Sequence, residues 1–183
     1  RAYWDGGLPH HRPRKPGMSD LEYQIYNWYN FCWICGDNIV EQHVHNMDIM
    51  NWVLNSHPIS VVAAGGRAWK PKIEEYGNIW DSFSCDFEYP NGVHVFSFSR
   101  HWNNSYSEVS ERVFGTKKDV QNGISNCCDM ARAGNGYVQE HANLQASITG
   151  EGKYLNESMQ VAESVFTTIF GRMAAYSGKK LLW

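Results

Sequence analysis

The sequence lacks a long hydrophobic run and an excess of either charge. No apolar stretch approaches the ~18 residues that a membrane-spanning helix needs, so we expect no membrane partner. The 16 Lys and Arg residues nearly balance the 19 Asp and Glu residues, and the formal net charge is -3 at pH 7. Because nucleic-acid binding depends on a basic surface, we also expect no nucleic-acid partner.

Charged residues and cysteines are both scarce. Charged residues make up 19% of the chain, below the roughly 25% of an average soluble domain. Hydrophobic residues make up 43% of the 183 residues, enough for one core, so we expect one domain over residues 1–183. The five cysteines are an odd number without regular spacing, which argues against a disulfide scaffold. Cys32 and Cys35 have the spacing of a metal or redox pair, but we favour a position in a helical core.

The first third of the chain changes character twice. Residues 1–19 are rich in Gly, Pro and basic residues without a period, which predicts an irregular N-terminal arm whose first residues form no strand. Dense aromatic residues from residue 21 onward predict a helix that is covered on most sides and ends at Gly36. A second helical period follows over residues 39–56 and ends before Pro58.

The rest of the chain predicts strands and then helices. Alternating apolar residues at 79–89 and 93–100, separated by the turn 90–92, predict an antiparallel hairpin. Further strands are expected at 58–70 and 106–115 and at the edge 181–183, and helices at 137–148 and from Asn156 to a cap at Gly178. The order predicts an α+β fold with an open, largely antiparallel sheet and helices packed on one face.

The second predicted helix carries a strip of polar side chains. Glu41, His45, Asp48 and Trp52 fall within ~60° of one another on a helical wheel at ~100° per residue. A carboxylate one turn from a histidine can accept its ring N–H and make it a usable general base near neutral pH. A solvated face with ion pairs is the alternative. His43 lies among apolar positions, where it needs a hydrogen-bond partner; because it projects about 200° away from His45, the pair cannot share one metal ion.

Several motifs along the chain carry a family resemblance. They are Gly36-Asp37-Asn38-Ile39-Val40-Glu41-Gln42-His43-Val44-His45-Asn46-Met47-Asp48, Asn51-Trp52-Val53-Leu54, His57-Pro58, Gly65-Gly66-Arg67, Tyr89-Pro90-Asn91-Gly92, Gly115-Thr116-Lys117, Ala162-Glu163-Ser164 and Gly171-Arg172-Met173-Ala174-Ala175-Tyr176. In this order and spacing they resemble the second domain of the Gfo/Idh/MocA oxidoreductases, over nearly the whole chain.

The resemblance implies a two-domain enzyme of which this chain matches only the C-terminal domain, used for substrate binding and oligomerisation. The N-terminal Rossmann domain of the parent protein, its catalytic Lys and a G-x-G-x-x-G motif have no counterpart in the sequence. NAD or NADP is therefore expected in the full-length parent and not on this chain alone. The family's catalytic Asp and His fall on Glu41 and His45, with the next acidic position on Asp48. Glu at position 41 departs from the family pattern.

We expect a sugar or polyol-like substrate. Polar and aromatic residues at the ends of predicted strands suit a sugar ring, which is apolar on its face and polar at its rim; pairing on the surface is the alternative, and for these residues the more common one. The candidate substrate-binding residues are these strand-end residues, Arg67, Asp81, Arg100, His101 and Trp102, together with Asp48 on the second predicted helix. A homo-oligomer formed through the sheet face of residues 79–115 is also expected, with Trp80, Phe96 and Phe98 covered by it. The alternative function is a non-catalytic carbohydrate-binding or interaction module that uses the sheet face.

Overall fold

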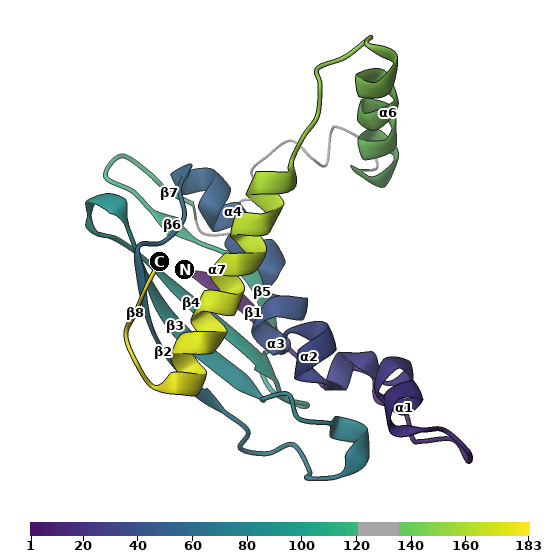
Figure 1. The fold of residues 1–183 in the computed structure, drawn as a ribbon. Coiled ribbons are helices and arrows are strands. Elements are labelled where there is room, and N and C mark those ends of the chain that lie inside the picture. The colour runs from purple at the N-terminus through teal and green to yellow at the C-terminus, as the bar shows by residue number, and fades with distance from the viewer. Residues whose placement is uncertain (121–135) are drawn as a thin grey trace.

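The computed structural model describes residues 1–120 and 136–183, in which one six-stranded sheet forms the centre (Figure 1). The sheet has the order β5-β1-β4-β3-β2-β8, and only the β1–β4 pair is parallel. The strands are β1 (Ala2–Gly6), β2 (Ser60–Gly66), β3 (Ser82–Tyr89), β4 (Val93–His101), β5 (Glu108–Glu111) and β8 (Leu181–Leu182), and β6 (Val113–Phe114) pairs with β7 (Asp119–Val120) in a separate ribbon. The predicted hairpin and edge strand are confirmed.

The N-terminal strand is the main departure from the predicted topology. The prediction that residues 1–7 form no strand is wrong, because β1 lies inside the sheet between β4 and β5. Ala2 is fully buried and stands opposite Ser97 on β4 and Glu111 on β5. The predicted antiparallel meander therefore stops at β4, and the third strand reaches the sheet only by pairing with β1.

Helices cover one face of the sheet, as predicted (Figure 1). The covering helices are α3 (Asn38–Glu41), α4 (Val44–Leu54) and α7 (Ser158–Ser177). The other described helices are α1 (Asp20–Tyr26), α2 (Cys32–Cys35) and α6 (Gly136–Thr149), and the 3-10 turns are η1 (Trp28–Asn30), η2 (Glu74–Tyr76) and η3 (Pro90–Gly92). Helix α7 ends at Gly178, whose φ of 65° is the left-handed conformation expected of a cap. None of the described helices combines the length and hydrophobicity that crossing a bilayer requires.

Both helices predicted in the first third of the chain are interrupted. The first is divided into α1, η1 and α2. At the break, the buried side-chain amide of Asn27 donates to the carbonyl of Glu75, and that of Asn30 donates to the carbonyl of His10. The second is divided into α3 and α4 at Gln42 and His43. The expectation of one continuous helix over residues 39–56 is therefore wrong.

The core lies between the sheet and helices α3, α4 and α7. Side chains alternate along β3, and those at the apolar positions Phe83, Cys85, Phe87 and Tyr89 are all buried. Gly171 of α7 lets the helix approach the sheet, because a Cβ there would lie 2.7 Å from Cζ of Phe87. The tight fit explains why a glycine stands in the middle of a 20-residue helix.

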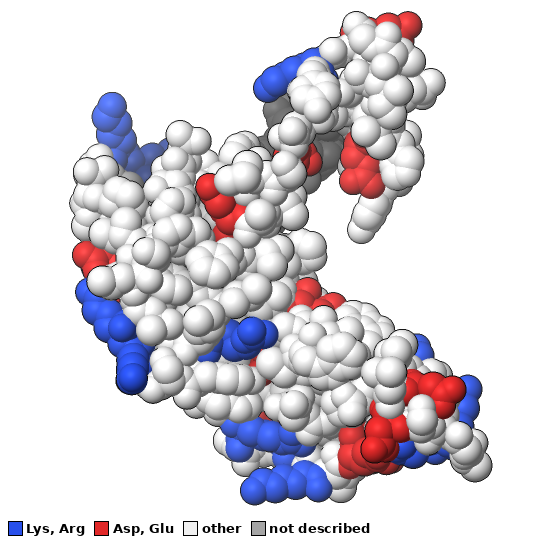
Figure 2. Space-filling view, viewed as in Figure 1, with Lys and Arg blue, Asp and Glu red and all other residues white. Residues whose placement is uncertain are grey.

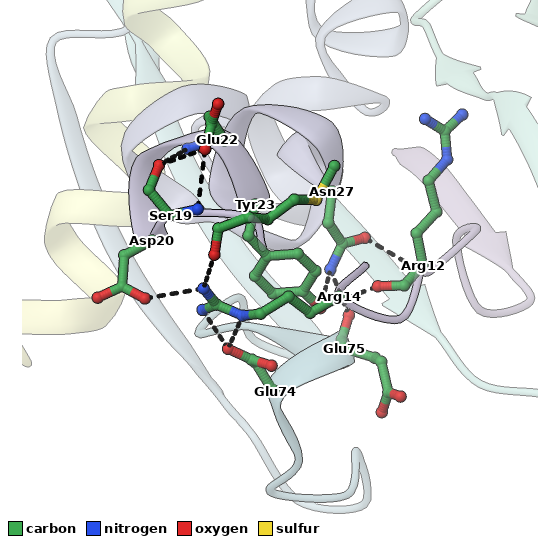
Figure 3. A network of polar contacts seen from close by, with 10 residues as sticks. Arg12, Arg14, Ser19, Asp20, Glu22, Tyr23, Asn27, Glu74 and Glu75 are labelled. Carbon is green, nitrogen blue, oxygen red and sulfur yellow. Dashed lines mark hydrogen bonds and ion pairs between the residues drawn. The ribbon is translucent and has the colours of Figure 1, made fainter. Parts of the chain in front are cut away.

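The chain between β1 and α1 is irregular but anchored (Figure 3). Arg14 binds both Asp20 in α1 and Glu74 in η2, and its guanidinium lies 4.6 Å from the centre of the Tyr23 ring. The hydroxyl of Tyr23 donates to the carbonyl of Arg12 at 2.8 Å. These contacts fix the part of the arm that carries His10.

Figure 2 shows the face covered by α7. Acidic and basic side chains lie in separate small groups, and most of the surface over the middle of α7 is uncharged. The surface is deeply hollowed on one side, between α6 and the region of α1 (Figure 2). Helix α6 stands away from the sheet, and Leu144 and Ile148 on it are exposed.

Candidate functional site

The junction between α3 and α4 places Glu41 against a buried tyrosine. Glu41 is the last residue of α3, and Tyr29 in η1 is 4% exposed. Burial, followed by a hydrogen bond to the Glu41 carboxylate, raises the pKa of Tyr29 well above its usual value. The Oε2 atom of Glu41 is buried and has no hydrogen-bond partner among the residues described. A buried carboxylate oxygen without a donor is uncommon and calls for an explanation.

His45 lies in the first turn of α4 and is exposed. Its ring lies 6.0 Å, between centroids, from that of Trp4 on β1. The imidazole is therefore accessible and bordered by one large aromatic side chain.

The rest of the predicted polar strip faces other neighbours. Asp48 accepts a hydrogen bond from the hydroxyl of Ser164 in α7, at 2.6 Å, so its carboxylate joins the two helices. Trp52 is 59% exposed one turn further on. Because the helix is interrupted between Glu41 and His45, the strip does not form one face. Its members have different neighbours: Tyr29 for Glu41, Trp4 for His45 and Ser164 for Asp48.

His43 is fully buried and its two ring nitrogens are both paired. Asn46 donates through its amide to Glu111, so its oxygen Oδ1 is an acceptor for Nδ1–H of His43 at 2.9 Å. The hydroxyl of Ser97 then donates to Nε2 at 2.7 Å. Burial lowers the pKa of His43 to about 4. The expected hydrogen-bond partner of His43 is therefore present, and the imidazole is neutral.

A buried lysine, Lys70, lies next to His101. Lys70 is 4% exposed, and its ammonium lies 3.0 Å from the carbonyl of Trp80 and 3.2 Å from Nδ1 of His101. His101, at the end of β4, is 2% exposed, and its ring centroid lies 5.9 Å from that of Tyr29. His101 thus connects Lys70 to the tyrosine that lies against Glu41.

Two of the predicted substrate contacts hold the loop that carries Lys70. The carboxylate of Asp81, which is fully buried, accepts hydrogen bonds from the backbone N–H groups of Ala68, Trp69 and Lys70. The guanidinium of Arg67 donates to the carbonyls of Gly77 and Pro71. Both side chains already have partners within the fold.

The remaining two predicted contacts lie elsewhere. Arg100 faces the side of the sheet that no helix covers, where it lines a hollow of about 540 Å³ together with Tyr3, Asp5 and Phe98. Trp102 is 44% exposed, and its ring lies 5.7 Å from that of Trp69. The structure brings His101 and Glu41 to the same site through Tyr29, while Arg100 lies on the opposite face of the sheet from His101.

Sequence reasoning missed Tyr29, Lys70 and His10. The ring of His10 lies 5.3 Å from that of Tyr29, on the arm. Lys70 follows a Gly-rich strand and precedes Pro71, a pattern that indicates a loop but does not indicate burial. No group of three or more His, Cys, Asp or Glu residues that could hold a metal ion occurs in the part of the chain that the structure describes.

The architecture is that of an α+β domain with a mixed sheet covered by helices on one face. The sequence profile described as the GFO/IDH/MocA C-terminal domain matches residues 14–121, and the chain belongs to this family. No curated protein matches the sequence.

Solved structures share the fold. Myo-inositol 2-dehydrogenase from Lactobacillus plantarum is 12% identical, with a TM-score of 0.62 over 99% of this chain and 55% of that one. UDP-N-acetylglucosamine 3-dehydrogenase from Acidithiobacillus ferrooxidans is 12% identical, with a TM-score of 0.60 over 96% of this chain and 52% of that one. Scyllo-inositol dehydrogenase from Lactobacillus casei, with bound NAD(H) and scyllo-inositol, is 10% identical, with a TM-score of 0.54 over 80% of this chain and 48% of that one. The chain spans about half the length of these structures.

Proposed function

We propose that the chain is the substrate domain of an NAD(P)-dependent oxidoreductase that acts on a hydroxyl of a sugar or polyol. The observation that carries the proposal is the buried, unpartnered Oε2 of Glu41, four residues before the exposed His45 and on the other side of the break between α3 and α4. Leaving such an oxygen without a donor costs about 1–3 kcal/mol. A substrate hydroxyl would supply that donor.

The two side chains suit the proton chemistry of this reaction. Oxidation of a secondary alcohol removes the hydroxyl proton while hydride leaves the same carbon. Bound NAD or NADP supplies the hydride acceptor. In this proposal His45 takes the hydroxyl proton, and Glu41 accepts a hydrogen bond from the substrate or orients His45.

The nucleotide is proposed to be held by another domain of the parent protein. The sequence has no G-x-G-x-x-G motif, which normally cradles the pyrophosphate at a helix N-terminus. The hollow between α6 and the region of α1 offers space for a neighbouring domain (Figure 2). Calorimetry of the 183-residue chain with NAD and NADH is expected to give no binding. A micromolar Kd would overturn the domain assignment.

The substrate class rests on relatives and on aromatic side chains. The structural relatives named above are dehydrogenases of inositols and a nucleotide sugar. Trp4 beside His45 offers a flat apolar surface of the kind on which a sugar ring packs. The parent protein should therefore reduce NAD or NADP in the presence of at least one inositol or aldose from a panel. Coenzyme reduction that is unchanged when both Glu41→Gln and His45→Ala are introduced would reject the proposed site.

We further propose that the open face of the sheet forms a homo-oligomer. Val62 and Phe96 on this face are 52% and 43% exposed, and such apolar surface favours association. Trp80, which was expected to add to this face, instead packs on the Tyr176 ring of α7 at 4.2 Å. Light scattering should give at least a dimer, and Phe96→Ser should weaken it, whereas Leu144→Ser on α6 should not. A clean monomer of the wild type at tens of micromolar would contradict this proposal.

A second candidate function uses the same open face. The hollow of about 540 Å³ there has one cation, Arg100, one carboxylate, Asp5, and the stacked rings of Tyr3 and Phe98, whose centroids are 5.5 Å apart. This composition suits a carbohydrate bound without redox chemistry. Sugar binding by the chain that is lost in Arg100→Ala and kept in Glu41→Gln would favour this alternative.

A further inference from the structure

The loop between β2 and β3 is built to place one buried ammonium. Asp81 binds three successive backbone N–H groups at the start of the loop, including that of Lys70. Arg67 holds the carbonyls of Pro71 and Gly77 further along. Backbone groups on both sides of Lys70 are therefore fixed by buried or half-buried charged side chains. This arrangement gives the Lys70 side chain little freedom to leave its position.

The ammonium of Lys70 determines which nitrogen of His101 carries a proton. An ammonium has three N–H donors and no acceptor. The Nδ1 atom of His101, 3.2 Å from Nζ of Lys70, must therefore be the acceptor. Burial and the charge of Lys70 also lower the pKa of His101 to about 3, so the ring is neutral. A neutral imidazole whose Nδ1 accepts a hydrogen bond carries its single proton on Nε2.

The fixed imidazole lies directly against the candidate site. The ring of His101 packs on Tyr29 at 5.9 Å between centroids, and Tyr29 packs on His10 at 5.3 Å. Interaction with the Glu41 carboxylate is, after burial, a further cause that raises the pKa of Tyr29. Lys70, His101 and Tyr29 are all less than 5% exposed.

We propose that Lys70 is a positioning residue that holds His101 in its neutral Nε2–H tautomer and, through His101 and Tyr29, sets the orientation of the Glu41 carboxylate. The role rests on the proposed function of Glu41. A purely structural role of Lys70, as a counter-ion for the buried carboxylates of Asp81 and Asp37, requires no particular tautomer of His101. The response of His101 and Tyr29 to loss of the Lys70 ammonium therefore separates the two explanations.

The first test is the tautomer in the wild-type chain. Proton–nitrogen correlation spectra of the 183-residue chain, uniformly labelled with nitrogen-15, distinguish an Nε2–H from an Nδ1–H imidazole. We expect His101 to show the Nε2–H pattern at pH 7. An Nδ1–H pattern, or a mixture of the two, overturns the proposal without any variant being made.

The second test removes the donor. Met has a side chain of similar length without N–H groups. In Lys70→Met, His101 should therefore lose the pure Nε2–H pattern, and the ring signals of Tyr29 should shift. Lys70→Arg, which keeps a cationic donor, should restore most of both. Lys72→Met, an exposed lysine in the same loop, is the matched control and should leave them unchanged. Retention of the Nε2–H pattern and of the Tyr29 shifts in Lys70→Met overturns the proposal. If Lys70→Met does not fold, the wild-type tautomer decides alone.

The third measurement keeps this inference separate from the proposed function. In the parent protein, Lys70→Met should lower kcat on the sugar that the wild type oxidises, and Lys70→Arg should recover part of the loss. A normal kcat in a Lys70→Met variant with altered tautomer would overturn the positioning role. A parent protein that oxidises no sugar, with the spectra as expected, would instead reject the proposed function and leave the assignment of His101 intact.

Discussion

His43 and His45 are two residues apart and differ in almost every physical property. His43 is fully buried, with Asn46 and Ser97 on its two ring nitrogens. His45 is exposed, and its ring lies 6.0 Å, between centroids, from that of Trp4. The helical period of the sequence already placed His43 among apolar positions and His45 in a polar strip, but it did not show which groups each ring would meet. The difference arises from the sheet, which offers a hydroxyl to one ring and an aromatic edge to the other.

The comparison sets a buried histidine beside an accessible one, only two residues apart. A buried imidazole with both nitrogens paired is fixed as a neutral group and cannot act as a base near neutral pH. The exposed ring of His45 is accessible to a bound molecule. Substitution of each histidine should therefore change a different measurable property of the protein.

The largest expected effect is on turnover. His45→Ala in the parent protein should lower kcat by about 10²–10⁴, the usual contribution of a general base, while nucleotide affinity stays nearly unchanged. The thermal midpoint should also remain close to that of the wild type, because His45 is exposed. Full turnover in His45→Ala would show that another group carries the proton.

The next effect is on stability. His43→Ala leaves Ser97 and Asn46 without their partner and opens a cavity, so we expect the free energy of unfolding to fall by about 2–4 kcal/mol. For a chain of this size each kcal/mol corresponds to a change in Tm of about 2–4 °C. Thermal melting of the 183-residue chain measures the loss, with His45→Ala as the matched control. Abolished turnover in a His43→Ala parent that melts normally would reverse our assignment of the two histidines.

A smaller effect is expected in the pH dependence of stability. Burial lowers the pKa of His43 from 6.5 to about 4. Between these values the unfolded chain binds a proton that the folded chain does not, so this group favours the folded state less as the pH falls from 6.5 to about 4. The stabilisation is fully present above pH 6.5. At about 1.4 kcal/mol per pH unit, the loss is at most about 3 kcal/mol.

The corresponding measurement compares two proteins. Urea unfolding of the wild type and of His43→Gln at several pH values should give a steeper decline for the wild type between pH 6.5 and 4. The carboxylates that are common to both proteins cancel in this difference. Parallel curves would mean that His43 titrates normally in the folded state.

Local patterns predicted most of the sheet and both C-terminal helices. The alternation in β3, the turn at η3 and the cap at Gly178 each depend on residues close together in sequence. The pairing of β1 depends instead on contacts with residues about one hundred positions away, such as Ala2 with Ser97 and Glu111. A short segment with two glycines and two aromatic residues has no local feature that reveals such a partner.

The candidate site was predicted in part for the same reason. Glu41 and His45 were predicted because they lie in a motif that resembles the family's sequence. Lys70 and Tyr29 are part of the site because both are buried and both contact His101. Lys70 lies in a loop and Tyr29 in a short 3-10 turn, where the sequence does not indicate burial. The helix break at Gln42 and His43 coincides with a tertiary contact, the hydrogen bond between His43 and Ser97. Propensity alone favours a continuous helix at this point.

The place of β1 in the sheet has a consequence for how the chain folds. Strand β5 reaches the sheet only through β1, and β1 joins β4 in a parallel pair whose connection runs through α1 to β3. Closing so long a loop is entropically costly, and such non-local pairs form slowly. We therefore expect β2, β3 and β4 to assemble first, and β1 and β5 to join last and together. Until they do, the edge of β4 is unpaired, and a folding intermediate of this kind is prone to join with the same edge of another molecule.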